Sequence, residues 1–509
     1  MISNTDKIKT IDELQLISNQ KRLEGKKIVH CHGVFDLLHI GHIRYFEQAR
    51  KMGDVLIVTI TSDIYVDKGP HRPAFDETLR AEAIASLSII DYVAINPWAT
   101  AEETLRLIRP HFYVKGSEFK NISSDMTGKI AKEEQVVKDI GATLAFTEDI
   151  VFSSSNLINR YLSKLPEEIN NYLELFRSRY NLDEILQILD KMANLNVLVI
   201  GDTIIDDYQY CKAIGISSKD PALVVKYNSH DIFAGGVIAV ANHVANFAKS
   251  VKLVTVLGER DSYEDFIKSQ LKSTISFKFA TQPNSPTIVK RRFIDGYSFN
   301  KLFEVYVMDD TGLPKEKDIE LQNYIKNEIS NYDLVIAADF GHGAISKDMV
   351  SFLETYSPFL SVNTQANAGN RGFHTISRYS RADYACIAEH ELMLEMRTQN
   401  INLRQEMMNI RNKLGCYQFV VTRGRNGCAI CDKYGEFVHV PAFAQKVVDR
   451  VGAGDAFLSV ASLASSQKVP NEILCFIGNV VGALAVEIIG NKKSIDKLSV
   501  KKYIVSLLK

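Results

Sequence analysis

The sequence predicts an α/β protein of two domains. A chain of 509 residues is longer than one ordinary core usually serves. Apolar strands alternate with helices in two separate series, one over residues 27–150 and one from residue 196 to the C-terminus. This alternation indicates parallel sheets joined by right-handed crossovers. Each series also contains a glycine turn directly before a helix, a common phosphate-binding position in such sheets.

The composition is that of a globular protein without a bulk charge preference. There are 60 Lys and Arg residues against 61 Asp and Glu residues, and 46% of the residues are hydrophobic. This balance gives no reason to expect nucleic acid or an anionic membrane as a partner. The first residues lack a signal-peptide core, and no apolar run is long enough to span a bilayer. We therefore expect a cytoplasmic protein.

The seven cysteines are scattered through strand-like and helical segments, which is typical of reduced thiols rather than a disulfide framework. Cys428 and Cys431 form the one C-x-x-C pair. Because no second pair lies nearby at zinc spacing, we interpret the segment as a β-hairpin.

The first series predicts a domain over residues 1–165, followed by a charged helical connector over 166–193. Its strands are expected at 27–35, 54–62, 91–96, 111–116 and 143–148, with helices near 41–52, 77–88, 101–108 and 126–140.

The second series predicts one large α/β domain over residues 194–509. Its main strands are expected at 196–208, 250–258, 333–341, 359–365, 383–391 and 418–427. Residues 209–230 and 286–308 are extended and contain aromatic residues, so we expect them to form a small sheet that covers a site.

The segment HCHGVFDLLHIGH (30–42) places histidines around a glycine turn. His39 and His42 are three residues apart at the first turn of a helix and therefore lie on one face. Two imidazoles beside free N–H groups can bind a phosphate and stabilise charge that develops on it. A capped helix with incidental histidines is the alternative. His32 is expected to line the site, and His30 to pack within the strand.

The motif GVFDLLHIGH resembles the N-terminal motif of the cytidylyltransferase-like nucleotidyltransferases. Further matches follow in that family's order: KGPHRP (68–73), RAEAIASLSIIDYV (80–93), FYVKGSEF (112–119) and FSSSNLIN (152–159). The resemblance covers roughly residues 27–162. It is nearest to the sugar-phosphate adenylyltransferase domain of bifunctional heptose enzymes, with glycerol-phosphate cytidylyltransferases next.

This resemblance implies a Rossmann-like domain in which a sugar 1-phosphate attacks the α-phosphorus of a nucleoside triphosphate and releases pyrophosphate. His39 and His42 would stabilise the transition state. The other nucleotide and phosphate contacts implied are Gly33, Phe35, Lys68, Arg72, Arg80, Ser153, Ser154 and Ser155. Each of the three basic residues has a solvated surface charge as its alternative. Asp36 either orients the histidine loop or caps the next helix.

The strongest stretch of the second half is DRVGAGDAFLSV, residues 449–460. Gly452, Ala453 and Gly454 lack bulky side chains, so their N–H groups can close on an anion at the helix start. Asp455 then stands next to that anion, where a carboxylate can accept a proton from an attacking hydroxyl. A glycine-rich helix cap is the alternative.

That motif resembles the D-x-x-G-A-G-D pattern of the ribokinase-like sugar kinases, over about residues 194–500. Supporting matches are GDTIIDDY (201–208), GGVIAVANHVANFA (235–248), ADFGHG (338–343) and VTRGRNG (421–427). The resemblance implies Asp455 as general base and sugar contacts from Asp206, Gly235, Gly236 and Asn242. It implies nucleotide contacts from Thr422, Gly424, Gly427, Gly452, Ala453 and Gly454.

Two departures from the kinase pattern stand out. The spacing from Gly236 to Asn242 is longer than usual. Cys386 replaces the asparagine of the family's N-x-x-E motif, whereas Glu389, which would act through water on magnesium, is retained.

Taken together, the two halves resemble bifunctional heptose kinase/adenylyltransferases with the domain order reversed. We expect an enzyme of nucleotide-sugar synthesis that uses ATP and Mg²⁺, with CTP possible at the N-terminal site. Small-molecule substrates and a homo-oligomer formed through the kinase domain are implied. Two alternatives stay open: a cytidylyltransferase for a non-sugar alcohol phosphate fused to a sugar kinase, or one half that is an inactive sensor or scaffold.

Overall fold

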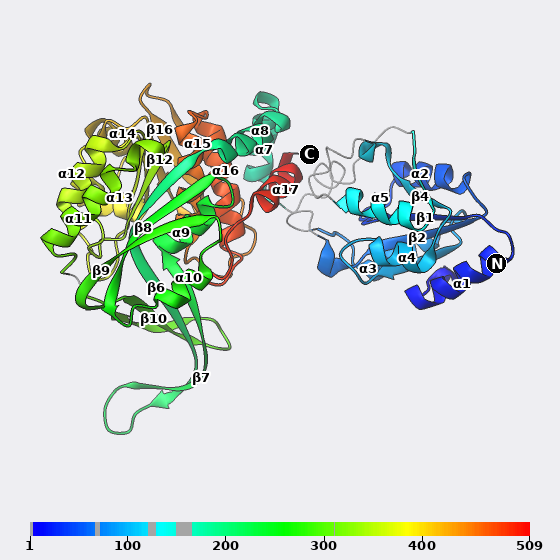
Figure 1. The fold of residues 1–509 in the computed structure, drawn as a ribbon, viewed down its shortest axis with the longest axis horizontal. Coiled ribbons are helices and arrows are strands. Elements are labelled where there is room, and N and C mark those ends of the chain that lie inside the picture. Colours follow the sequence, from blue (N-terminus) through cyan, green and yellow to red (C-terminus); the bar gives the residue numbers. More distant parts are fainter. Residues whose placement is uncertain (1–3, 67–71, 121–128, 149–164, 310, 509) are drawn as a thin grey trace. The chain divides into compact units, whose positions relative to one another are not determined.

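The computed structural model describes residues 4–66, 72–120, 129–148, 165–309 and 311–508. The chain divides into two compact units, Met1–Pro166 with Val505–Lys509, and Glu167–Ile504 (Figure 1). Each unit is described by itself. Within the described ranges, no helix has both the length and the apolar character that crossing a membrane requires.

The first unit contains a five-stranded parallel sheet with the strand order β3-β2-β1-β4-β5. The strands are β1 (Ile28–Gly33), β2 (Val55–Thr61), β3 (Tyr92–Asn96), β4 (Phe112–Lys115) and β5 (Thr143–Phe146). The helices are α1 (Ile11–Leu23), α2 (Ile40–Arg50), α3 (Glu77–Ala85), α4 (Glu102–Ile108) and α5 (Lys129–Asp139). The strand order reverses between β1 and β4, and ligands of such sheets bind outside the carboxyl ends of the strands at this point.

The second unit is built on a larger sheet. Its parallel part runs in the order β9-β8-β6-β12-β13-β14-β15, and β16 and β17 continue it in antiparallel fashion. The strands are β6 (Asn196–Ile216), β8 (Ser250–Arg260), β9 (Ile275–Pro286), β12 (Leu334–Asp339), β13 (Leu360–Thr364), β14 (Tyr384–Ala388), β15 (Gln418–Thr422), β16 (Cys428–Asp432) and β17 (Phe437–Val440). The predicted hairpin around Cys428 and Cys431 is β15–β16, and both thiols are buried.

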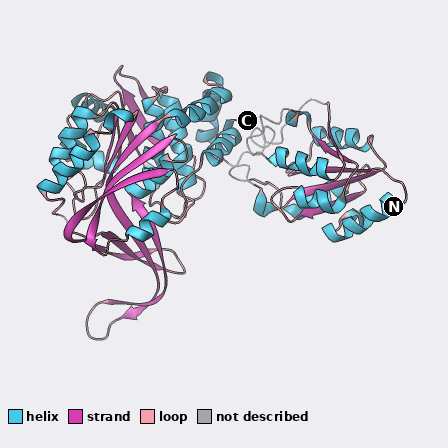
Figure 2. Ribbon diagram, in the orientation of Figure 1, coloured by secondary structure: helices cyan, strands magenta, loops and turns pink. Residues whose placement is uncertain are grey.

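The same unit contains a small second sheet, as predicted. The second half of β6 leaves the central sheet and pairs with β7 (Leu223–Gly236) and β10 (Ile288–Asp295), and β10 pairs with β11 (Lys301–Val307). Figure 2 shows the ends of β6 and β7 projecting as a long hairpin. Because β6 belongs to both sheets, a residue in its middle lies where the two sheets meet.

Helices cover the central sheet. They are α9 (Val237–Val244), α10 (Glu264–Gln270), α11 (Lys315–Lys326), α12 (Lys347–Tyr356), α13 (Glu389–Met396), α14 (Leu403–Leu414), α15 (Ala453–Ser466) and α16 (Asn471–Ala485). The last helix is α17 (Lys497–Leu508), whose residues from Val505 onward are grouped with the first unit. Helices α15 and α16 are buried over most of their length, as all-round apolar helices are.

The segment predicted as a connector forms α7 (Glu167–Arg179) and α8 (Leu182–Lys191). Phe176 stacks on Phe476 of α16 with a distance of 4.3 Å between ring centroids, and Arg179 pairs with Glu472 at 2.9 Å. These helices are therefore part of the second unit rather than a free linker.

Candidate active sites

The two predicted histidines lie together at the start of α2. Their rings stack with 3.9 Å between centroids. His39 is the N-cap, and its Nδ1 accepts a hydrogen bond from the Gly41 N–H at 3.1 Å. In a neutral ring the proton then sits on Nε2, which makes that atom a donor. Burial lowers the pKa of His39, which favours this neutral form.

The Phe35 ring packs against one of the two histidines, His42. Its ring meets the ring of His42 edge-on with 5.4 Å between centroids, and it folds back over Gly33. A Cβ atom at Gly33 would lie 2.9 Å from the Phe35 ring, so a larger residue does not fit there. The Phe35 side chain, predicted as a nucleotide contact, packs in the core instead.

The structure corrects the prediction for Arg80. Its side chain is 0% exposed and donates to the carbonyl oxygens of Phe75, Val34 and Thr61 and to the Asp63 carboxylate. The guanidinium group is a buried clamp that ties α3 to the ends of β1 and β2. It is neither a phosphate ligand nor a solvated surface charge.

Asp36 and Arg72 form a second structural pair. The Asp36 carboxylate accepts from the Ala74 and Phe75 N–H groups at 2.7 and 3.1 Å, and it lies 3.7 Å from the guanidinium of Arg72. The prediction that Asp36 caps the next helix was wrong, because His39 caps α2. The Asp36 carboxylate instead ties the histidine loop to the segment before α3, and a role in orienting that loop stays a prediction. The Arg72 side chain is 4% exposed, and its contact with a phosphate stays a prediction.

His30 and His32 are joined through the hydroxyl of Thr59. The His30 Nε2 and His32 Nδ1 atoms lie 2.8 and 2.9 Å from Thr59 Oγ1. His30 is fully buried in the strand, as predicted. Burial, followed by the charge of Lys115, lowers the pKa of His32 to about 4, so this ring is neutral. Four predicted residues lie outside the described part of the chain: Lys68, Ser153, Ser154 and Ser155.

In the second unit, a cavity of about 140 Å³ lies at the carboxyl ends of β13, β14 and β15 and at the start of α15. It brings the predicted residues Thr422, Gly454, Asp455 and Cys386 together. It is also lined by Asn363, Gln365, Ala366, Ile387, Ala388, His390 and Glu391.

Asp455 is a buried carboxyl group in this cavity. Burial, followed by the nearby charge of Asp206, raises its pKa to about 7, while the charge of Lys290 acts in the opposite direction. A carboxylate that is partly protonated near neutral pH is well suited to accept a proton during a reaction.

Asp206 is fixed where the two sheets meet. It accepts hydrogen bonds from Arg292 and, at 3.2 Å, from Asn491 Nδ2. A Cβ atom at Gly235 would lie 2.2 Å from Asp206 Oδ2, so the carboxylate needs glycine at this position. Gly236 follows with a φ of 56° and leads into α9.

The predicted phosphate turns have glycine-dependent backbones. Gly452 caps α15 with a φ of 81°, and a Cβ atom there would lie 2.3 Å from Asn491 Oδ1. Ala453 is the first residue of α15. Gly424 and Gly427 also have positive φ angles, and a Cβ atom at Gly427 would lie 2.0 Å from the Val440 oxygen. The glycines thus allow neighbouring groups of the protein to lie close to the backbone of these turns.

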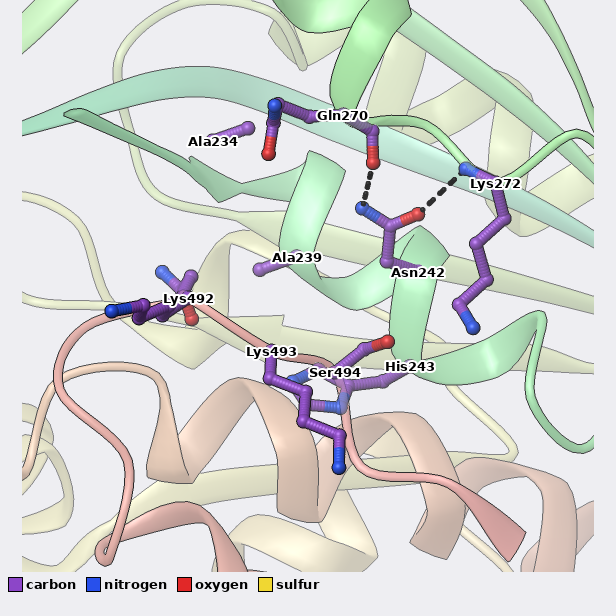
Figure 3. Close-up of a pocket in the computed structure, with 10 residues that line it drawn as sticks. Ala234, Ala239, Asn242, His243, Gln270, Lys272, Lys492, Lys493 and Ser494 are labelled. Carbon is purple, nitrogen blue, oxygen red and sulfur yellow. Dashed lines mark hydrogen bonds between the residues drawn. The ribbon is translucent and has the colours of Figure 1, made fainter.

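Asn242 lies beside a different cavity of about 240 Å³ (Figure 3). Its Nδ2 donates to the Gln270 oxygen, and its Oδ1 accepts from the Lys272 N–H, both at 3.1 Å. The amide therefore ties α9 to the end of α10. Its contact with a sugar stays a prediction. The cavity is lined by Ala234, Ala239, Asn242, His243, Gln270, Lys272, Asn491, Lys492, Lys493 and Ser494.

Glu389 and Glu391 both stand in the first turn of α13 and differ in surroundings. Glu389 pairs with Arg423 at 2.9 Å. Glu391 lines the cavity and accepts from the Ala388 and Ala366 N–H groups at 2.7 and 2.8 Å. Burial raises the pKa of Glu391 to about 7. Sequence reasoning missed it, although the E-H-E spacing offered a second carboxylate.

Magnesium would need ligands beyond the protein. Among the described residues, no group of three or more His, Cys, Asp and Glu side chains could hold a metal ion. Mg²⁺ commonly takes one or two carboxylates together with substrate phosphates and water. Glu391 and Asp455 supply carboxylates of that kind in one cavity, so the donor set fits Mg²⁺ delivered with ATP.

The family model described as pfkB family carbohydrate kinase matches residues 194–498. The chain belongs to this family. A second family model, described as cytidylyltransferase-like, matches residues 30–160 of the same chain. The two matches confirm the predicted fold class, two α/β domains with the transferase domain first, and the predicted enzyme class, a carbohydrate kinase and a nucleotidyltransferase.

Curated relatives resemble the N-terminal part of this pfkB-family chain. The "Bifunctional protein HldE" of Aliarcobacter butzleri is 42% identical over 134 residues, which are 26% of this chain and 28% of that protein. The protein of that name from Geobacter metallireducens is 36% identical over 168 residues, 32% of each chain. The chain thus spans about a third or less of these relatives.

Solved structures resemble the kinase domain. The tetrameric inhibited form of phosphofructokinase-2 from Escherichia coli superposes with a TM-score of 0.51 and 14% identity. The superposition covers 62% of this chain and 100% of the phosphofructokinase-2 chain. At this identity the likeness shows the fold alone.

Proposed function

We propose that this pfkB-family chain is a bifunctional enzyme of nucleotide-sugar synthesis. Its kinase domain, over residues 194–509, would phosphorylate the anomeric hydroxyl of a sugar phosphate with ATP. Its transferase domain, over residues 1–165, would join the resulting sugar 1-phosphate to a nucleotide. The observation that carries the proposal is the buried Asp455 carboxyl group, with its pKa near 7, at the glycine-capped start of α15.

In the kinase reaction, the anomeric oxygen attacks the γ-phosphorus of ATP and ADP leaves. Asp455 accepts the hydroxyl proton, and the free N–H groups at the start of α15 stabilise negative charge on the phosphates. Asp206, held by Arg292 and Asn491, would orient the sugar hydroxyls. Magnesium bound with ATP would neutralise phosphate charge, with Glu391 the carboxylate better placed to hold it than Glu389, whose carboxylate is paired with Arg423.

In the transferase reaction, an oxygen of the sugar 1-phosphate attacks the α-phosphorus of the nucleoside triphosphate and pyrophosphate leaves. His39 and His42 would donate hydrogen bonds to the oxygens on which charge develops. Because His39 Nδ1 already accepts the Gly41 N–H, Nε2 is the atom of His39 that would do so.

We propose a phosphorylated seven-carbon sugar as the substrate because the transferase motifs resemble those of bifunctional heptose enzymes. The relatives that resemble the transferase domain carry the name bifunctional protein HldE, which fits two activities in one chain. Three lysines, Lys272, Lys492 and Lys493, line the cavity next to Asn491, whose amide contacts Asp206, and this positive charge suits an anionic group. We further propose a homo-oligomer formed through the kinase domain, as the resemblance to the sugar kinases implies.

The test is a mass-spectrometric screen of six- and seven-carbon sugars and sugar phosphates with each nucleoside triphosphate. The expected result is a sugar 1-phosphate from ATP and then a nucleotide sugar with release of pyrophosphate. The cytidylyltransferase-like match favours a second candidate, transfer from CTP to a non-sugar alcohol phosphate. Product formed from CTP and an alcohol phosphate, but from no sugar phosphate, would support that candidate. Binding without turnover at either site would contradict the proposal for that half.

A further inference from the structure

Lys115 stands at the carboxyl end of β4, at the edge of the sheet that carries the histidines. The register that pairs Cys31 with Val114 puts Lys115 level with His32, at the end of β1. Tyr45, one turn after His42 on α2, donates its hydroxyl to the Val114 oxygen at 2.6 Å. The histidine-bearing helix is thus fastened to the residue directly before Lys115.

A buried carboxylate holds the ammonium group of Lys115. Lys115 Nζ lies 2.9 Å from Glu133 Oε2, and the two side chains are 10% and 4% exposed. Glu133 comes from α5 and also accepts from the Tyr113 hydroxyl at 2.8 Å and the Ala101 N–H at 3.3 Å. Burial is the largest single influence and alone would raise the pKa of Glu133. The Lys115 charge, a contribution from His32 and the hydrogen bonds from Lys115 and Tyr113 together outweigh burial, so the pKa falls below its usual value. The pair is therefore ionic.

Lys115 differs from the buried Arg80 at the same edge. Arg80 donates to three carbonyl oxygens and one carboxylate, with all three of its nitrogens engaged. An ammonium group has three N–H donors, and Glu133 takes one of them. The Tyr113 ring, 4.9 Å away, presents its face to the same group. Lys115 thus keeps a positive charge that can also face a ligand.

Nucleotidyl transfer brings two anions together. A sugar 1-phosphate oxygen forms a bond to the α-phosphorus, the bond from that phosphorus to the bridging oxygen breaks, and pyrophosphate leaves with the electron pair. Positive groups near the phosphorus stabilise the charge that spreads over its oxygens. The neutral His32 beside Lys115 cannot supply that charge.

We propose that Lys115 is a further catalytic residue of the transferase, whose ammonium group contacts the reacting phosphates, and that Glu133 is the residue that positions it. The proposal rests on the nucleotidyl transfer proposed above.

The experiment compares two variants of the full chain, Lys115→Met and Lys115→Met/Glu133→Gln. The single variant leaves the Glu133 carboxylate buried without its partner, which should lower both stability and turnover. The double variant removes both charges. The glutamine oxygen can accept from the Ala101 N–H, and its NH2 group can donate to the Tyr113 hydroxyl oxygen. Thermal unfolding should therefore return close to that of the wild type. Pyrophosphate release should stay about 100-fold or more below it, because the charge at the phosphates is still missing.

A structural role for Lys115 predicts a different result. If the lysine serves only to neutralise Glu133, the double variant recovers turnover together with stability, and that recovery would overturn the proposal. Lys138 and Glu134 form a matched control, since this pair is also ionic, lies on the helix that carries Glu133 and is more exposed, at 64% and 28%. The Lys138→Met/Glu134→Gln variant should retain transferase turnover. Kinase turnover of each variant reports that the rest of the chain is folded.

Glu133→Gln alone decides the matter if the methionine variants do not fold. It keeps the Lys115 charge and removes both the compensating negative charge and the carboxylate that positions the ammonium group. KM for the anionic acceptor at low salt should therefore fall by about threefold or more, and kcat should fall as well. An unchanged KM would contradict contact between Lys115 and the phosphates. If the wild type releases no pyrophosphate with any acceptor and triphosphate, the proposed function fails and this inference with it. Normal wild-type turnover with an unaffected double variant removes the inference alone.

Discussion

Replacing Asp455 by Asn separates a catalytic role from a structural one. The amide keeps the size of the aspartate and its position in the first turn of α15, but it does not accept a proton at neutral pH. If Asp455 is the general base, sugar phosphorylation should fall by about 100- to 10,000-fold. The wild-type rate should also fall as the pH drops below about 7, because protonated Asp455 cannot take the proton from the sugar.

The same substitution should make the protein more stable at high pH. The folded-state pKa of about 7 lies above the ordinary 3.8, so the stability contributed by this group is present below pH 3.8 and is lost as the pH rises through 7. The difference between the two values corresponds to an upper limit of ~4 kcal/mol. Asn cannot ionise and avoids this loss. The variant should therefore gain stability over the wild type as the pH rises from 5 to 8.

Two measurements check this reasoning. Denaturant unfolding of both proteins at pH 5 and pH 8 gives the stability difference, and ADP release gives the rate. A variant that is less stable than the wild type at pH 8 would refute the electrostatic argument and indicate a damaged helix start. Phosphorylation within about tenfold of wild type would show that the proton goes elsewhere. Transfer from a supplied sugar 1-phosphate should continue in the variant and serves as the control.

Three further predictions concern the other site residues. His39→Ala and His42→Ala should each lower pyrophosphate release by about 100-fold or more, since each removes a donor to the developing charge; near-normal release by both would refute their role. His39→Ala should also lower the free energy of unfolding by about 1 kcal/mol, because it removes the N-cap of α2. Arg80→Leu should destabilise the transferase domain by at least about 2 kcal/mol, because four buried or partly buried oxygen acceptors lose their donor. If the variant unfolds at the same denaturant concentration as the wild type, these hydrogen bonds do not stabilise the domain. Glu391→Gln should raise the Mg²⁺ concentration needed for half-maximal kinase turnover by about tenfold, and Glu389→Gln by less; the reverse order would return the metal role to Glu389.

The strands were predictable because they are buried on both faces of parallel sheets and so are nearly continuous apolar runs. The small sheet was predictable from extended segments rich in aromatic residues. The packing of α7 was not. Its charged surface indicates a connector, whereas the contact between Phe176 and Phe476 joins residues 300 positions apart, and no local pattern reports such a pair.

Basic residues of the transferase domain show a second limit. The sequence places Arg72 and Arg80 near a triphosphate loop and gives each a positive charge. It cannot show that the Arg80 donors meet three carbonyl oxygens, or that the Arg72 charge is paired with Asp36. Whether a cation serves the fold or a ligand depends on the direction of its donors, and that direction is set by loops with no periodic pattern.

The two glutamates of α13 show how a motif can indicate the right helix and leave the residue open. Residues two apart on a helix point in widely different directions, so Glu389 and Glu391 cannot face the same ligand equally. The N-x-x-E resemblance selects Glu389, but this chain has Cys386 in place of the asparagine, and Glu389 is paired with Arg423. The cavity instead contains Glu391 together with Asp455. Both carboxyl groups have a pKa raised to about 7 by burial, so each is poised to lose its proton when a cation enters with the nucleotide. Cation binding would then stabilise the ionised form of Asp455, the form that the base needs, and so couple the metal to the proton transfer.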